Sequence, residues 1–498
     1  MRKFLLFAII FYSVLLLLPN YRHYPMDGVS DFLQIVAHWG LSALGLYFII
    51  FIISLNKYLC AVLLPILSLA SGITAFFVWQ IDISVNPALI ESIMHTDAGE
   101  VANYMSLSLC LFVVFLLLTT AFFCIWRFRI KWQRKELLVF LSAALISGII
   151  FNTVNHKRRN TLNNRAPFVF YRAIKEYRES ITDASAPRKS AGEIIECKED
   201  SLTVILVIGE ALRADHLQMN GYQRITMPLM EKRNVISFPN TFSAHTHTAA
   251  SIPYILTRAK PGFPSPSNEE HSLISLFSKC GYKTTWLANQ NPIKTFSYFT
   301  KECDSIIVNK PQLEDYSNTP KYDSDLLPHF ERLLADDSPL KLIVVHLAGN
   351  HWWYNKNLPP DYHYFTPVLN NKRLSADNRE RMINTYDNVT RFTDYVLDQM
   401  MKQVEDKKAW MIFLADHGQS FGEDGKWLHG NDRPQEQNPA CFAWFSQSYQ
   451  ESLHTNIEQM QNRRLDTIDT AFLFHTLLKG SGIKTTTYEA DFDLFSSP

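Results

Sequence analysis

Long apolar runs lie almost entirely in the first third of the chain. Before residue 156, five segments are apolar enough to cross a membrane as helices: residues 4–18, 32–55, 58–79, 105–126 and 137–154. A hydrocarbon layer about 30 Å thick needs roughly 20 such residues in helical form. We therefore expect a transmembrane domain of five helices over residues 1–155. The first run has no small-residue cleavage site after it, so we interpret it as a retained helix and not as a signal peptide.

Basic residues between the runs predict the orientation. Arg2, Lys3, Lys57 and a basic cluster at residues 127–135 share one side of the membrane, whereas residues 80–103 contain no Lys or Arg. By the positive-inside rule, the basic side is the cytoplasm. The basic residues of the segment 157–165 follow the fifth helix on the outer side and conflict with this assignment, although long translocated domains respond weakly to such charges. The opposite orientation remains the alternative.

Residues 156–200 form a connector in this interpretation. Phe168, Val169, Tyr171 and Ala173 lie among basic residues there. Two structures fit this pattern, an interfacial helix on the bilayer surface and a partly ordered linker.

From residue 201 to 498, short apolar runs alternate with segments of helical period. This alternation is typical of an α/β domain with a mainly parallel sheet. The expected strands are residues 203–208, 284–288, 342–347 and 410–414. A helix is expected after Ser375, because the apolar residues that follow it recur at helical spacing.

Candidate metal ligands follow three of these strands. Glu210 comes after the first strand, His351 shortly after the third, and Asp416-His417 after the fourth. Because ligands bind at the carboxyl ends of strands in open α/β sheets, these side chains are expected to form one metal site. Taken singly, Glu210 or Asp416 has a simpler interpretation as a helix cap. Asp215-His216 is a weaker pair, which we expect on the surface of a helix or turn.

Charge and cysteine content narrow the picture further. Lys plus Arg equals Asp plus Glu, at 48 each, so that no net positive field favours a nucleic-acid partner. Four cysteines lie outside the apolar runs, and we expect Cys280 and Cys303 to form a disulfide because they bracket a predicted strand and turn. Cys197 with Cys441 is a second conceivable pair, without a geometric argument.

Several ordered motifs resemble the phosphoethanolamine transferases of the alkaline phosphatase and sulfatase-like superfamily. The resemblance spans essentially the whole chain and rests on these segments: Val207-Ile208-Gly209-Glu210, Arg213-Ala214-Asp215-His216, Asn220-Gly221-Tyr222, Phe238-Pro239-Asn240, Thr246-His247-Thr248-Ala249-Ala250-Ser251-Ile252-Pro253, Tyr386-Asp387-Asn388, Asp416-His417-Gly418-Gln419-Ser420 and Leu428-His429-Gly430. It implies a bacterial inner-membrane enzyme whose catalytic domain, residues 201–498, lies in the periplasm.

The resemblance also implies the chemistry. Glu210, Thr248, Asp416 and His417 are expected to bind one zinc ion, although manganese also suits these ligand types. Thr248 is expected to be the nucleophile. His351 and His429 are expected to bind substrate or a second metal, and one of them to protonate the leaving alkoxide. Phosphoethanolamine would pass from phosphatidylethanolamine through Thr248 to lipopolysaccharide or another lipid-linked glycan. A monomer in contact with membrane lipids is the expected state.

Local reasoning about Thr248 leaves alternatives open. The residue is expected to begin a helix that Pro253 confines to this region, where its hydroxyl would by itself serve as a cap. Ala244-His245 and Tyr254 replace the Cys-Gly and Cys of many family members. His245 and His247 are then either extra ligands, a proton donor, or residues that shape the loop by hydrogen bonding.

Three aromatic residues follow His351. Trp352, Trp353 and Tyr354 either hold the ethanolamine cation, dip toward the bilayer, or pack in the core.

Rival functions are a phosphoglycerol transferase of the lipoteichoic-acid synthase type, a sulfatase, and a non-catalytic membrane scaffold or transporter. A sulfatase is disfavoured because Ile255 occupies the position where its maturation motif needs Arg.

Overall fold

The protein is described here from a computed structural model. It describes residues 1–21, 29–81, 85, 89–90, 93–94, 105–157, 167–184, 187–290, 296–309, 322–371 and 374–496. Two compact units are present: residues 1–94 with 104–177, and residues 95–103 with 178–498.

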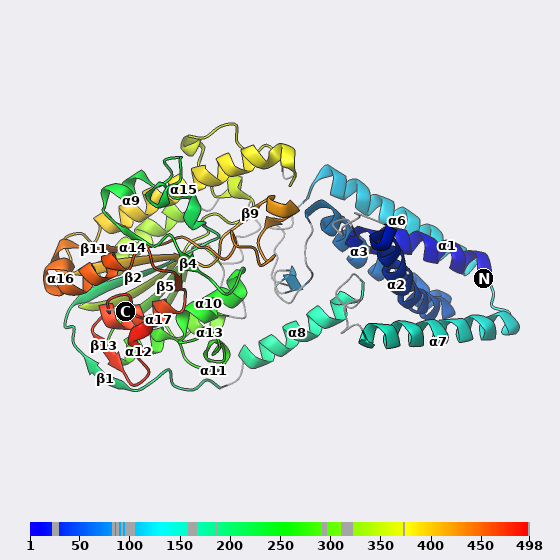
Figure 1. Ribbon diagram of the computed structural model, residues 1–498, viewed down its shortest axis with the longest axis horizontal. Coiled ribbons are helices and arrows are strands. Elements are labelled where there is room, and N and C mark those ends of the chain that lie inside the picture. The colour runs from blue at the N-terminus through cyan, green and yellow to red at the C-terminus, as the bar shows by residue number, and fades with distance from the viewer. Residues whose placement is uncertain are drawn as a thin grey trace. The chain divides into compact units, whose positions relative to one another are not determined.

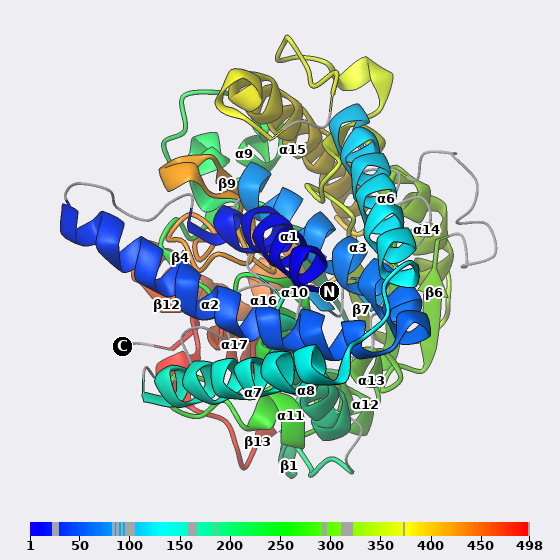
Figure 2. The same ribbon diagram turned by 90° about the vertical axis from the view of Figure 1, so that its right-hand side faces the viewer.

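In the part of the first unit that the structure describes, five helices are long and apolar enough to cross a membrane. They are α1 (Arg2–Tyr12, which continues through a π-helical and a 3-10 segment to Tyr21), α2 (Val29–Leu55), α3 (Lys57–Ile81), α6 (Leu107–Phe128) and α7 (Arg134–Lys157). Helix α2 packs along α7, and α3 packs along α6 (Figure 2). The five predicted helices are thereby confirmed to within a few residues.

Two buried polar side chains inside this unit, Tyr12 and Arg127, are paired. Tyr12 is fully buried, and its hydroxyl contacts Ser68 Oγ at 2.8 Å and Thr120 Oγ1 at 3.3 Å. Arg127 donates to the carbonyl oxygens of Ser54 and Leu55 at the end of α2. These contacts satisfy groups that would be costly to leave unpaired in an apolar surrounding. Arg158, Arg159 and Arg165, which argue for the opposite orientation, lie outside the described residues.

The connector contains a helix, α8 (Val169–Ala184). Val169, Ala173 and Tyr177 recur at a spacing of four and are buried, whereas Tyr171 is exposed. The segment is therefore helical over these residues. One side of α8 is apolar and packed, which is the usual pattern of an amphipathic helix.

The second unit is built on a seven-stranded sheet with the order β3-β11-β8-β2-β7-β5-β6 (Figure 1). The strands are β2 (Leu202–Gly209), β3 (Ile236–Ser237), β5 (Lys283–Ala288), β6 (Ser305–Val308), β7 (Leu340–His346), β8 (Ala409–Ala415) and β11 (Cys441–Phe445). Strands β8, β2, β7, β5 and β6 run parallel, and β11 pairs with β8 and β3 in the antiparallel sense. The predicted α/β class and all four expected strands are confirmed.

Helices cover both faces of the sheet. Helices α9 (Pro228–Lys232), α14 (Leu327–Leu334) and α15 (Arg379–Lys402) lie on one side in Figure 1, and α10 (Thr248–Leu256), α12 (Leu273–Lys279) and α17 (Phe472–Gly480) lie on the other. Every residue of β2 is buried, which explains why its sequence is a continuous apolar run. The helix expected after Ser375 begins with a 3-10 turn at Ala376–Asn378 and continues as α15.

The remaining strands form three short pairs. They are β1 (Ile194–Cys197) with β13 (Ile483–Thr485), β4 (Thr241–Phe242) with β12 (Ile468–Asp469), and β9 (Ser420–Phe421) with β10 (Trp427–Leu428). The described part of the unit also contains the helices α11 (Pro266–Glu269), α13 (Ser297–Thr300) and α16 (Gln447–Asn462) and several 3-10 turns, one of them at Asp323–Leu326.

The predicted Cys280–Cys303 disulfide is wrong. Cys280 is bonded to Cys197, with the two Cα atoms 5.8 Å apart, and both Cys303 and Cys441 are free. Cys197 ends β1, which pairs with β13 at the side of the unit where α12 ends, so that the end of α12 meets β1. Cys441 lies buried in β11, inside the central sheet, and is therefore unavailable to Cys197.

Candidate metal centre

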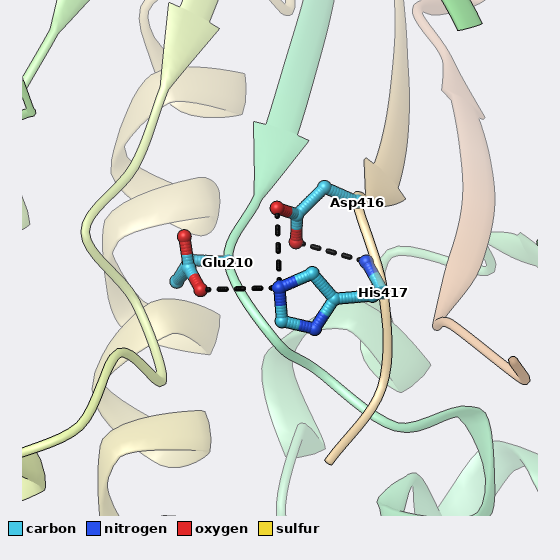
Figure 3. A group of neighbouring side chains, drawn as sticks. All are labelled: Glu210, Asp416 and His417. Carbon is cyan, nitrogen blue, oxygen red and sulfur yellow. Dashed lines mark hydrogen bonds and ion pairs between the residues drawn. The ribbon is translucent and has the colours of Figure 1, made fainter. Parts of the chain in front are cut away.

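Strand register brings the first three candidate ligands to one edge of the sheet. Ile208 pairs with His346 and Gly209 pairs with Ala415, so that β2, β7 and β8 end side by side. Glu210, Asp416 and His417 follow these ends, and their side chains converge (Figure 3). One ligand atom from each of the three lies within 4.8 Å of the others, and all three residues are buried.

Thr248 joins this group from the start of helix α10. Its Oγ1 donates to Asp416 Oδ2 at 2.6 Å and lies 3.4 Å from Glu210 Oε2. Helix α10 begins at Thr248, as predicted, with Pro253 inside it. The cap is not Thr248, however, because the preceding His247 accepts the N–H of Ala250 through Nδ1. The hydroxyl of Thr248 is therefore free to face the two carboxylates.

Backbone contacts fix the carboxylate of Asp416. Its Oδ1 accepts from the N–H groups of Ala211, at 3.1 Å, and of His417, at 2.9 Å. This leaves Oδ2 for Thr248 and for the space beside His417 Nε2, which is 3.5 Å away. One oxygen of Asp416 is thus held by the protein, and the other points into the cluster.

The imidazole of His417 has a defined tautomer. Its Nδ1 lies 2.7 Å from the carbonyl oxygen of Gly418, which only accepts, so that Nδ1 carries a proton. In the neutral ring, Nε2 then presents a lone pair toward Glu210 Oε1, 3.6 Å away. Both atoms are buried and have no hydrogen-bond partner among the residues that the structure describes. Lone pairs facing each other in a buried site repel one another unless a proton or a cation lies between them.

These donors suit a metal ion. Two carboxylates, an imidazole and a hydroxyl are a four-ligand set that zinc accepts. Burial, and next the charge of Asp416, raise the pKa of Glu210 well above its usual value. A bound cation would offset this cost by favouring the ionised carboxylate.

The remaining predicted site residues lie around this group. The ring of His429 is 4.4 Å from that of His417, and its Nδ1 contacts Gln419 Oε1 at 3.2 Å. Burial lowers the pKa of His351 to about 4. Burial also lowers the pKa of His429 well below its usual value, and the nearby His417, His351 and His247 act in the same direction.

Loop geometry places His429 near the threonine. Leu428 and Gly430 both adopt positive φ, 65° and 81°, which turns the chain sharply around His429. The N–H of Gly430 then donates to the carbonyl oxygen of Thr246 at 3.1 Å. The loop of His429 and the loop that leads into Thr248 are thus bonded to each other.

The structure gives different roles to the other candidate residues discussed from the sequence. His247 shapes the loop by capping α10, in line with the third alternative given for it, and the ring of His245 packs edge-on against Tyr254 at 5.2 Å. Trp352 and Tyr354 are buried and pack against each other, as expected for core residues. The surface placement expected for Asp215-His216 is right for Asp215 and wrong for His216. His216 is buried because its Nδ1 contacts the buried carboxylate of Asp387 at 2.7 Å.

Two residues near the site were missed. Gln290 donates to Glu210 Oε2 at 3.1 Å and to the carbonyl oxygen of Leu347 at 2.6 Å. It comes two residues after β5, so that the rule applied to the other three strands would have found it. His346, the last residue of β7, is fully buried between the rings of Trp286 and Phe296, and neither of its ring nitrogens has a hydrogen-bond partner.

Comparisons with known proteins identify the family and the fold. The family model described as Sulfatase matches residues 203–483, and the one described as Phosphoethanolamine transferase EptA/EptB matches residues 43–159. Phosphoethanolamine transferase EptA of Helicobacter pylori is 27% identical over 433 residues, which cover 83% of this chain and 80% of that protein.

Two solved structures show the same fold. The integral membrane lipooligosaccharide phosphoethanolamine transferase A of Neisseria meningitidis has a TM-score of 0.85 at 20% identity, with 100% of this chain and 99% of that chain covered. The periplasmic domain of Escherichia coli EptC, crystallised in complex with Zn, has a TM-score of 0.56 at 22% identity, with 62% and 90% covered. With the sulfatase model matching more than half of the chain and the transferase model matching its membrane helices, the chain belongs to the sulfatase family and, within it, to the phosphoethanolamine transferases.

Proposed function

We propose that this protein transfers phosphoethanolamine from phosphatidylethanolamine to a lipid-linked acceptor, through a covalent intermediate on Thr248. One observation carries the proposal: the hydroxyl of Thr248 is directed at two buried carboxylates and an imidazole whose ligand atoms converge. A threonine hydroxyl is a poor nucleophile unless a base or a metal activates it, and this cluster offers the second route.

Glu210, Thr248, Asp416 and His417 would hold the metal, which we take to be zinc. An imidazole among the ligands favours zinc over manganese. The E. coli EptC domain, which shares this fold, was crystallised with Zn, and this supports the choice. When bound, zinc supplies Lewis-acid stabilisation of negative charge on the phosphoryl oxygens.

The reaction has two displacement steps. Thr248 Oγ1 gives up its proton and forms a bond to phosphorus while the bond from phosphorus to the diacylglycerol oxygen breaks, and that oxygen takes up a proton. An acceptor hydroxyl, which gives up its proton, or an ionised phosphate oxygen then forms a bond to phosphorus, the bond to Oγ1 breaks, and Oγ1 takes up a proton again. We assign His351 and His429 to the proton transfers and to holding the phosphoryl group, because both belong to the cluster of histidines around His417.

A periplasmic position for the catalytic unit, residues 201–498, fits the structure. The disulfide joins Cys197, just before this unit, to Cys280 inside it, and disulfides persist in oxidising compartments. We propose that the five helices hold a monomer in the inner membrane, where both lipid substrates are concentrated. The acceptor class that we propose is lipopolysaccharide, since the N. meningitidis relative of the same fold acts on lipooligosaccharide by name.

The test uses the full chain in detergent with phosphatidylethanolamine and lipid A. Mass spectrometry of the lipid products should show one added phosphoethanolamine with the wild type and none with Thr248→Ala. A gain of phosphoglycerol from phosphatidylglycerol would indicate the rival transferase. Absence of any transfer with every lipid-linked acceptor offered would overturn the proposal.

A further inference from the structure

The turn after Glu210 is held by a buried tyrosine from a distant helix. Tyr386 lies in α15 and is fully buried. Its hydroxyl donates to the carbonyl oxygen of Ala211 at 2.7 Å and accepts from the N–H of Arg213 at 2.8 Å. One side chain thus satisfies two backbone groups on either side of Leu212.

Ala211 needs such a restraint. Its φ is 53°, in the left-handed region that residues with a Cβ atom rarely adopt. A non-glycine residue stays in this region only where surrounding contacts hold it there. The two hydrogen bonds of Tyr386 are contacts of that kind, and they act directly on the strained residue.

Both carboxylate ligands depend on Ala211. Glu210 precedes it in the chain, and the N–H of Ala211 donates to Asp416 Oδ1. Asn350 reinforces the link, because its N–H donates to the carbonyl oxygen of Glu210 and its side chain donates to the carbonyl oxygen of Tyr386. A shift of Ala211 would therefore move the carboxylates of Glu210 and Asp416 relative to each other.

The neighbour of Tyr386 fixes the helix in place. Asp387 is buried and accepts from Tyr222 and Arg224 while its other oxygen contacts His216. These four residues, Asp387, Tyr222, Arg224 and His216, lie in or beside sequence motifs that contribute no ligand to the metal site. Their contacts anchor α15 to the segment after Glu210, so that Tyr386 is held at a defined position.

We propose that Tyr386 is a positioning residue that sets the spacing of Glu210 and Asp416 for metal binding through its hydrogen bonds to Ala211 and Arg213. This inference rests on the zinc site of the proposed function. Loss of partners that orient metal ligands typically weakens metal binding by about 10- to 100-fold. We expect a loss in that range when the hydroxyl alone is removed.

A matched control separates positioning from ordinary stability. Tyr449, in α16, is also fully buried, and its hydroxyl also donates to a backbone carbonyl oxygen, that of Gly480, at 2.7 Å. Its contacts do not involve the metal centre. Tyr449→Phe should therefore cost stability as Tyr386→Phe does, because each leaves a buried backbone group unpaired, but it should leave metal binding unchanged.

The experiment measures zinc affinity of the full chain in detergent, by competition with a chelating dye, for the wild type and both variants. Cobalt absorption spectra of the same proteins report ligand geometry independently of activity. The inference predicts a zinc dissociation constant raised about 10-fold or more and an altered cobalt spectrum in Tyr386→Phe, with both unchanged in Tyr449→Phe. Equal zinc affinity and equal spectra in the two variants would overturn it.

The outcomes distinguish this inference from the proposed function. A wild type that binds no zinc contradicts the proposed metal centre itself. Should Tyr386→Phe not fold, the comparison is made in the Ala211→Gly background, where glycine adopts the positive φ without strain. Weaker zinc binding after adding Tyr386→Phe to that background supports the inference, and equal binding overturns it.

Discussion

Thr248 Oγ1 lies 2.6 Å from Asp416 Oδ2, although the two residues are 168 positions apart in the chain. The contact exists because His247 caps α10 in place of Thr248, and because two backbone N–H groups occupy the other oxygen of Asp416. The hydroxyl of Thr248 does not cap the helix and faces buried carboxylates, so it is available to react.

Loss of one carboxylate should empty the metal centre. Glu210→Gln or Asp416→Asn removes a negative charge from a buried site whose ligands must offset the desolvation of zinc. We expect metal analysis after dialysis to find zinc in the wild type and little in either variant. Asp394→Asn is the matched control, because Asp394 is equally buried and accepts backbone N–H groups of Leu229 and Met230, remote from the ligands. Full zinc content in both ligand variants would place the metal elsewhere.

The disulfide should stabilise the soluble unit. Cys197 and Cys280 are separated by 83 positions, and closing a loop of that length is worth about 4.5 kcal/mol in the chain-entropy model. Cys280→Ser should therefore lower the thermal midpoint of this unit clearly, whereas Cys303→Ser should leave it nearly unchanged. Non-reducing peptide mapping checks the pairing itself. A linked peptide that contains Cys303 would refute the assignment.

Asp394 should make stability depend on pH. Burial raises the pKa of Asp394 to about 7, although the two backbone N–H groups that its carboxylate accepts favour the ionised form. In the unfolded chain an aspartate titrates near about 3.9. Between these values the folded state holds a proton that the unfolded state has released, so the free energy of unfolding falls as pH rises from about 4 to about 7. The loss approaches about 4 kcal/mol at the upper end.

The Asp394→Asn variant lacks this titration. Its free energy of unfolding should therefore gain on that of the wild type as pH rises through the same window. Denaturant unfolding of both proteins at pH 4.5, 5.5, 6.5 and 7.5 measures the difference. Parallel stability curves across this range would show that burial does not raise the pKa of Asp394.

Local patterns in the sequence were sufficient for the elements and for part of the site. The five membrane helices α1, α2, α3, α6 and α7 could be predicted because a helix that crosses a bilayer needs a long apolar run. Strand β2 could be predicted because both of its faces are buried, which makes its sequence continuously apolar. Glu210, Asp416 and His417 follow strand ends, and a parallel sheet necessarily brings such ends to one edge. Gln290 obeys the same rule and was overlooked.

Features that depend on tertiary packing could not be predicted from the sequence. Pairing of Cys280 with Cys197 depends on where β1 runs along the unit, and spacing between cysteines contains no information on this. Burial of His216 depends on Asp387 from α15, which is 171 positions away. The capping role of His247 depends on the backbone conformation at the start of α10, where Thr is the more usual cap.

The most direct test of the account is a search for phosphoethanolamine on Thr248. Wild-type protein is incubated with phosphatidylethanolamine and no acceptor, digested, and examined by mass spectrometry, with Thr248→Ala and Thr246→Ala in parallel. Thr246 is the matched control because its Oγ1 donates to Asp432 and not to the metal ligands. The account predicts one added phosphoethanolamine on the peptide that contains Thr248, present in the wild type and in Thr246→Ala and absent from Thr248→Ala. An unmodified peptide, together with transfer by Thr248→Ala at a rate near that of the wild type, would contradict covalent catalysis at this residue.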